Sequence, residues 1–116
     1  MSKEYDIKDR TFKFARRILE ITAMLPKIVE CEIIRKQLAK AGTSIGANVE
    51  EADGALSKKD FINKMGIARR EAKESIYWLR LMVGRYIEEE RISSDIKEAN
   101  EIKNILSAII DNTKRK

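Results

Sequence analysis

The sequence predicts an all-α protein, folded as an antiparallel, up-down-up-down four-helix bundle. Apolar residues recur at three- and four-residue spacing in four successive segments. The 116 residues include only five Gly and one Pro, far fewer turn residues than a β-sandwich or β-barrel would need. The breaks between the segments are short, which makes consecutive helices antiparallel neighbours. We expect a single domain over residues 1–116, with helices at about 10–25, 30–54, 58–87 and 94–113.

Proline separates the first two predicted helices. We expect the first helix to start at a cap near Asp9 or Thr11 and to end at Pro26, because proline disfavours helical geometry at the residue before it. Gly54 stands where a left-handed C-cap would end the second helix. The predicted core positions are Phe14, Ile18, Ile21 and Leu25 in the first helix, and Ile34, Leu38, Ala41, Ile45, Val49 and Ala52 in the second.

The third predicted helix begins with a capping sequence. The Ser57 hydroxyl can accept hydrogen bonds from free N–H groups of the first turn, and the Asp60 carboxylate suits the positive end of the helix. A polar break over residues 88–94 precedes the last helix. The predicted core positions are Phe61, Met65, Ala68, Ala72, Leu79, Val83 and Tyr86 in the third helix, and Ile96, Ala99, Ile102, Leu106, Ile109 and Ile110 in the fourth.

The third helix carries a second apolar face, opposite its core face. This face consists of Ile67, Trp78 and Leu81, with Tyr77 at its edge. One interpretation is that Trp78 lies flat on the surface, partly covered by long Lys and Arg side chains. The interpretation that we favour is a protein–protein interface centred on Trp78, because aromatic residues dominate such interfaces. Self-association would need no other partner.

A strip of small residues lies beside the apolar stripe of the second helix: Ala39, Gly42 and Gly46. Each mid-helix Gly costs about 1 kcal/mol relative to Ala. We expect close packing of a neighbouring helix to offset that cost, and a ligand bound against the bare helix is the alternative. Asn48 lies at the edge of the buried face, where a polar residue can fix the register of packed helices.

Catalytic machinery is not predicted. The sequence has no His, which excludes His-ligated zinc, Ser-His-Asp catalysis and the Glu-x-x-His motifs of di-iron bundles. The stretch GTSIG lacks the ending of a phosphate-binding loop, and the single Cys31 has no His to activate it. We therefore expect no enzyme activity, no metal and no cofactor.

The chain is basic, with 24 Lys+Arg, 19 Asp+Glu and a net charge of +5. Candidate nucleic-acid-binding residues share a line on the third helix or cluster early in the second: Lys58, Arg69, Lys73 and Arg80, and Arg35, Lys36 and Lys40. For a single subunit, a solvated surface with internal ion pairs explains these residues equally well. An oligomer would sum the charge excess into a surface that attracts phosphate backbones without reading sequence.

Export and membrane insertion are not expected. No stretch approaches the roughly 20 apolar residues of a membrane span, and the charged N-terminal residues do not resemble a secretory signal. A single Cys also fits a reducing compartment. These features predict a cytoplasmic protein.

One long segment resembles a known family. Leu25-Pro-Lys27 is followed by the string QLAKAGTSIGANVEEADGALSKKDFINKMGIARREAKESIYWLRL. This string is similar to the bacterial four-helix-bundle proteins, also called the 23S ribosomal RNA intervening-sequence protein family, in which helix two reads QL.RA..SI..NI.EA and helix three reads S..DF...L.IA..EA.E...WL. Lys40 stands where Arg is frequent, and residues 53–55 replace a turn that usually holds Gly and Arg. These departures weaken the expectation of bidentate phosphate contacts there.

The resemblance implies a cytoplasmic bundle that assembles as a ring-like homopentamer. It also implies kinship with the accessory bundle proteins of diversity-generating retroelements, which bind nucleic acid and a reverse transcriptase. Two functional hypotheses follow. The first is an oligomeric bundle that binds RNA or DNA non-specifically as an accessory factor, and the alternative is a self-assembling protein-interaction scaffold with no nucleic-acid role.

Overall fold

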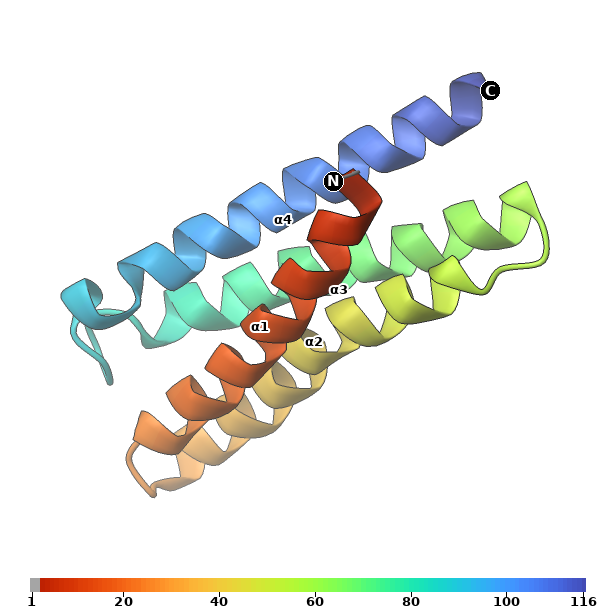
Figure 1. Ribbon diagram of the computed structural model, residues 1–116. Coiled ribbons are helices and arrows are strands. Elements are labelled where there is room, and N and C mark those ends of the chain that lie inside the picture. Colours follow the sequence, from red (N-terminus) through yellow and green to blue (C-terminus); the bar gives the residue numbers. More distant parts are fainter. Residues whose placement is uncertain (1–2) are drawn as a thin grey trace.

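Within residues 3–116 the chain forms four helices: α1 (Lys3–Met24), α2 (Val29–Asp53), α3 (Lys58–Met82) and α4 (Glu89–Arg115). The computed structural model describes the backbone of residues 3–116 and the side chains of residues 7–116, so that Met1 and Ser2 lie outside the described residues. Consecutive helices pack side by side in antiparallel order, and α4 returns beside α1 (Figure 1). The bundle measures 47 × 23 × 18 Å. This arrangement confirms the predicted all-α, up-down-up-down fold class.

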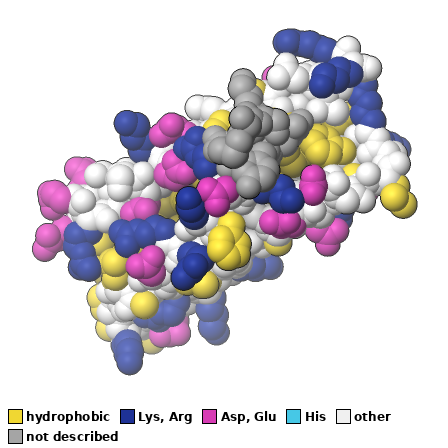
Figure 2. Space-filling model, viewed as in Figure 1, with side chains coloured by type: hydrophobic (Ala, Val, Ile, Leu, Met, Phe, Trp, Pro, Cys, Tyr) yellow, Lys and Arg dark blue, Asp and Glu magenta, His cyan; other side chains and the backbone are white. Residues whose placement is uncertain are grey.

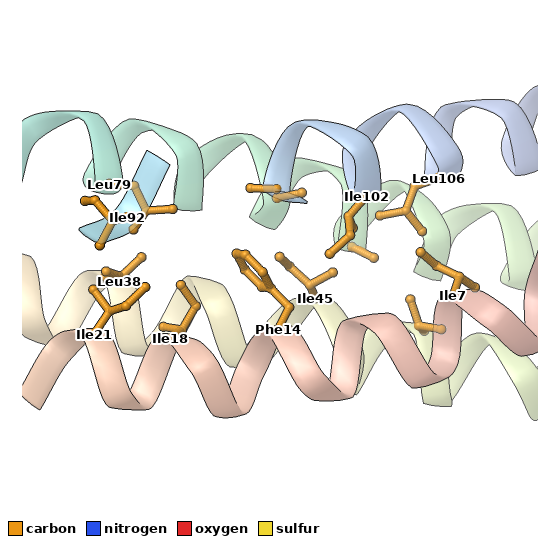
Figure 3. Packing of buried hydrophobic residues seen from close by; sticks show 14 of the residues in the cluster. Ile7, Phe14, Ile18, Ile21, Leu38, Ile45, Leu79, Ile92, Ile102 and Leu106 are labelled. Atoms are coloured by element: carbon orange, nitrogen blue, oxygen red, sulfur yellow. The ribbon is translucent and has the colours of Figure 1, made fainter. Parts of the chain in front are cut away.

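Polar and apolar side chains separate between surface and core. Lys, Arg, Asp and Glu side chains intermix on the face shown in Figure 2, whereas all four helices contribute apolar side chains to one continuous core (Figure 3). Every predicted core position of α1 and α2 is buried. The predicted positions of the other two helices are buried or, at the edge of the core, half-buried: Phe61, Val83, Tyr86 and Ile96. The core also contains residues that the prediction omitted: Ile7, Cys31, Met82, Ile87 and Ile92.

The first helix starts earlier than predicted. α1 extends back to Lys3, so the expected cap near Asp9 or Thr11 is wrong. Thr11 is buried inside the helix, and its hydroxyl donates a hydrogen bond of 2.8 Å to the carbonyl of Ile7 in the preceding turn. A Thr side chain that bonds back to its own helix does not act as a cap.

The first helix ends where the proline predicts. α1 stops at Met24, two residues before Pro26. The last carbonyls of a helix lack partners within it, and here the guanidinium of Arg35 supplies donors. It donates to the carbonyls of Thr22 (3.3 Å), Leu25 (3.0 Å) and Pro26 (3.2 Å). Arg35 therefore fixes the turn between α1 and α2.

The turn between α2 and α3 combines one confirmed and one wrong prediction. Ser57 is the N-cap of α3, and its hydroxyl accepts a hydrogen bond of 3.0 Å from the Asp60 backbone N–H, as predicted. Gly54 does follow α2, but its φ is −96°, which is not left-handed. Its N–H donates to the carbonyl of Glu51 in a tight turn that any residue can adopt.

The third helix ends five residues before the predicted position. α3 stops at Met82, and Gly84 adopts a φ of +79°, a conformation that favours glycine. The backbone N–H groups of Tyr86 and Ile87 donate to the Met82 carbonyl, which closes the turn. Residues 89–94, predicted as a break, form the first turns of α4, whose acidic start suits the helix dipole.

The two mid-helix glycines of α2 pack against α1. A Cβ atom on Gly42 would lie 2.7 Å from Cγ2 of Ile18, and a Cβ on Gly46 would lie 3.3 Å from the carbonyl oxygen of Thr11. Helix α1 therefore occupies the space against the small-residue strip. Ala39 is half-buried in the same strip, and the side-chain amide of Asn48 donates to the carbonyl of Ser44 within α2 (2.8 Å).

Ion pairs hold α1 against α4, the least extensive of the four helix–helix contacts. The Arg17 guanidinium donates to both carboxylate oxygens of Asp95, at 3.0 and 3.2 Å, and to the carbonyl of Arg91. The Arg10 guanidinium forms a second bidentate ion pair, with the Glu98 carboxylate. Asp95 is buried, so this seam carries charge where the other helix contacts are mainly apolar.

Candidate functional site

An apolar patch lies on the flank of the bundle where α2 meets α3. We define the apolar patch as Val29, Ile33, Tyr77, Trp78 and Leu81. The helices run antiparallel, Glu30 interacts electrostatically with Arg85, and Lys40 interacts with Glu71. This register places the start of α2 at the level of the last turns of α3. The surface exposure of four patch residues ranges from 43% to 77%, which makes the patch a candidate protein interface.

Trp78 is the half-buried base of the apolar patch. Its ring packs against the core and meets the Tyr77 ring edge-on, with 5.2 Å between ring centroids. Its indole nitrogen is buried and has no hydrogen-bond partner among the described residues. The Trp78 ring is therefore partly buried between the core and the surface, whereas the side chains of Tyr77 and Leu81 are exposed to solvent.

Ile67 lies apart from the other predicted interface residues. It is half-buried on the same flank of α3, but it precedes Trp78 by eleven residues, or about 16 Å along the helix. Sequence reasoning also missed Val29 and Ile33. Their four-residue spacing outside the core stripe of α2 is the signal that could have identified them.

The predicted basic row of α3 lies on the flank toward α4. The opposite flank faces α2, as the interaction of Glu71 with Lys40 shows. Arg69 is half-buried in the row, whereas Lys73 and Arg80 are exposed. Lys58 is exposed at the start of α3 and lines a shallow hollow with Thr113 and Lys116.

Helix α4 adds a basic residue that sequence reasoning did not include. Its acidic residues Asp95, Glu98 and Glu101 all pair with cations of α1. Lys103 follows Glu101 by two residues and lies on the flank of α4 that faces α3, whereas Lys97 precedes Glu101 by four residues and shares its face. We define the basic strip as Arg69, Lys73 and Arg80 of α3 with Lys103 of α4. A helical projection of α4 is the signal that could have found Lys103.

The cations of the basic strip have no ion-pair partner in the part of the chain that the structure describes. Among the described residues, every ion pair within 4.0 Å uses a cation of α1 or Arg35. The side chain of Lys103 only approaches the neutral Asn100 oxygen, at 3.5 Å. The strip therefore presents charge that the rest of the described chain does not neutralise.

The basic cluster predicted at the start of α2 does not act as one unit. Arg35 binds the end of α1 and pairs with Glu32, so its donors serve the fold. Lys36 and Lys40 are exposed. Lys40 faces Glu71, a carboxyl whose pKa is raised by its burial and by the nearby Glu74 charge. The structure thus brings Lys36 and Lys40, but not Arg35, to an open surface.

The described residues offer charge and apolar surface for binding. No three His, Cys, Asp or Glu side chains among residues 7–116 lie close enough to hold a metal ion. The helices of the described chain also include none with the length and apolarity of a membrane span. Two surfaces stand out on α3: the apolar patch, whose Trp78 lies on the side of α2, and the basic strip on the side of α4. Tyr77 lies between them, because it follows Lys73 by four residues and precedes Arg80 by three.

Comparisons with known proteins identify the family. The family model of the 23S rRNA-intervening sequence protein matches residues 3–108. A solved structure from Bacteroides thetaiotaomicron, described as a protein of unknown function from the S23 ribosomal protein family, is similar with a TM-score of 0.86. It is 39% identical, and the match covers 95% of this chain and 99% of that one. A search of curated proteins returned no match. The chain therefore belongs to the 23S rRNA-intervening sequence protein family.

Proposed function

We propose that this protein is a non-catalytic, oligomeric bundle that binds nucleic acid as an accessory factor through a basic surface summed over its subunits. The observation that carries the proposal is the distribution of ion pairs: among the described residues they involve four cations of α1 and Arg35 of α2, whereas the four cations of the basic strip form none. Unpaired cations attract phosphate, and bound Lys and Arg release counterions from nucleic acid.

Oligomerisation is the second part of the proposal. The apolar patch supports it, since a flank with Tyr77, Trp78 and Leu81 has the aromatic and aliphatic composition of an interface core. The resemblance of the sequence to its family implies a ring-like homopentamer. Repeated basic surfaces on one particle would bind a polyanion more tightly than a single subunit, because the later contacts become intramolecular.

A salt titration tests nucleic-acid binding. Fluorescence anisotropy with labelled duplex RNA and duplex DNA should show binding at low salt, and the logarithm of the affinity should fall linearly with the logarithm of salt concentration. Mass measurement by light scattering at micromolar concentration should show an oligomer. No binding of either nucleic acid at low salt would contradict the accessory role, and a monomeric mass would contradict assembly.

The alternative function is a self-assembling protein-interaction scaffold. The apolar patch favours it specifically, because this surface needs no nucleic acid to explain its exposed side chains. In a scaffold, charge reversal at Arg69, Lys73 and Arg80 leaves assembly and partner binding unchanged. An oligomeric mass combined with absent nucleic-acid binding in the salt titration would select this alternative.

A further inference from the structure

One end of the bundle combines a protruding leucine with a cluster of cations. Leu56, in the turn between α2 and α3, is 100% exposed. The end of α4 lies beside this turn, because Leu56, Lys58 and Lys116 line one hollow. Figure 2 shows Lys and Arg side chains gathered at the end of the molecule where Figure 1 marks the C-terminus. We define the cationic tip as the exposed leucine and the exposed basic residues around it: Leu56, Lys58, Lys59, Lys114, Arg115 and Lys116.

The fold does not neutralise the charge of the cationic tip. Among the described residues, none of its five cations forms an ion pair within 4.0 Å. The Asp53 carboxylate, which ends α2, pairs instead with Lys8 of α1 at 3.0 Å. Asp60 and Asp111 are the two acids in segments 56–60 and 111–116, and Asp60 lies at the positive end of the α3 dipole. The cationic tip therefore keeps an excess of positive charge.

Three residues of the cationic tip occupy positions that do not stabilise the fold. Lys58 and Lys59 are the first two residues of α3, where the positive end of the helix dipole disfavours cations. Leu56 is fully exposed, so its apolar side chain adds nothing to the core. A partner that accepts both positive charge and a protruding apolar side chain would account for all three positions.

The surface of an anionic bilayer is the partner that fits this combination. A nucleic-acid backbone would contact the cations, but its phosphates and sugars offer no apolar environment to Leu56. A protein would need a cavity shaped for the leucine, whereas the boundary between lipid headgroups and acyl chains accepts a protruding apolar side chain without one. Each Lys or Arg close to an anionic leaflet strengthens binding about fivefold.

We propose that the cationic tip docks on a bilayer that contains anionic phospholipid. Leu56 enters the boundary between headgroups and acyl chains, and the five cations contact the lipid phosphates. The bundle is 47 Å long, and docking by one end leaves the apolar patch and the basic strip uncovered. The proposal goes beyond the proposed function and does not depend on it, because the cationic tip and the basic strip share no residue.

Cosedimentation with vesicles tests the proposal on the full-length chain. Vesicles of phosphatidylcholine alone are compared with vesicles of phosphatidylcholine and phosphatidylglycerol in equal amounts, at several salt concentrations. The wild-type chain should bind the anionic vesicles, with a partition coefficient that falls as salt screens the charges. It should not bind the neutral vesicles, because one leucine inserts too little apolar surface to hold the protein without the cations.

A matched pair of double variants tests the cations. Lys114→Gln/Lys116→Gln removes two exposed lysines from the cationic tip, and Lys36→Gln/Lys40→Gln removes two exposed lysines from α2. The tip variant should lower the partition coefficient at least about tenfold. The α2 variant should stay within about twofold of wild type, since its lysines lie away from the bilayer.

A matched pair of single variants tests the leucine. Leu56→Gln should lower the partition coefficient at least about fivefold, because the apolar side chain no longer leaves water. Leu19→Gln, at an exposed leucine of α1, should leave it unchanged. Circular dichroism and light scattering check that every variant keeps the wild-type helix content and mass.

Absence of vesicle binding by the wild-type chain, or equal binding to neutral and anionic vesicles, would overturn the proposal. Equal losses in a tip variant and its control would overturn it as well. The same variants are titrated with a labelled RNA duplex. If the tip variant loses affinity for RNA and the wild-type chain binds no vesicles, the tip is a nucleic-acid surface and the membrane assignment is wrong. None of these results removes the proposed function, which the salt titration tests separately.

Discussion

At the scale of single residues, two glycines without side chains let α1 pack against the backbone of α2. Gly42 lets the branched side chain of Ile18 approach the α2 backbone, and Gly46 does the same for the Thr11 carbonyl. Glycine lowers helix stability by about 1 kcal/mol relative to alanine, and the packing of α1 at these positions offsets that cost. The sequence marks both glycines as unusual, but their partners depend on the register between helices, which periodicity alone does not provide.

Substitution of Gly42 tests this contact. Gly42→Ala should lower the free energy of unfolding by about 1–3 kcal/mol, because the new Cβ would lie within 3.0 Å of three atoms of Ile18 and overpack the core. Gly66→Ala is the matched control. It lies inside α3 with no atom within 4 Å of the added Cβ, so it should raise stability by about 1 kcal/mol. Urea unfolding measures both, and a stabilised Gly42→Ala variant would refute the packing role.

At the scale of helices, sequence periodicity predicted the elements better than their ends. The four helices and most core positions follow from apolar spacing and from Pro26 and Ser57. The ends of α1 and α3 were misplaced because Thr11 forms its hydrogen bond inside the helix and because Gly84, not the polar run after it, reverses the chain. The apolar patch and the basic strip were only half-predicted, since each one combines residues of two helices.

The seam between α1 and α4 permits a test at this scale. Arg17→Met should lower the free energy of unfolding by about 1.5–3 kcal/mol, because it leaves the buried Asp95 carboxylate without its charged donor. Lys13→Met is the control, since its ion pair with Asp9 is exposed to solvent and such pairs contribute at most about 1 kcal/mol. If chemical denaturation shows equal losses of unfolding free energy for Arg17→Met and Lys13→Met, the buried Arg17–Asp95 pair does not stabilise the α1–α4 contact more than an exposed pair would.

At the scale of the whole molecule, the proposed assembly and nucleic-acid binding use two neighbouring surfaces of α3. Trp78 lies on the α2 side and Arg69 on the α4 side, while Tyr77 lies between them, one turn from Lys73 and Arg80. Subunits that associate through the α2 side of α3 would therefore leave the flank toward α4 open to a ligand. The modest net charge of +5 on one chain becomes a strong attraction for phosphate only when several chains present it together.

A charge placed in the apolar patch tests this division. Leu81→Glu should shift the mass measured by light scattering from oligomer to monomer, because it buries a carboxylate in the proposed interface. Its duplex affinity should fall at least tenfold through lost multivalency, although the basic strip is unchanged. Leu56→Glu introduces the same charge at a fully exposed turn residue and should change neither mass nor affinity. An oligomeric Leu81→Glu variant would place the interface elsewhere.

The order of helix contacts also determines how the bundle folds. Three of the four helix contacts join neighbours in the chain, and such local contacts form quickly because little loop entropy is lost. The pair between Arg10 and Glu98 joins residues 88 positions apart, so we expect the α1–α4 seam to close last. Interactions that form after the transition state slow unfolding and leave the folding rate nearly unchanged. We therefore expect the ion pairs between α1 and α4 to slow unfolding of the bundle and to change its folding rate little.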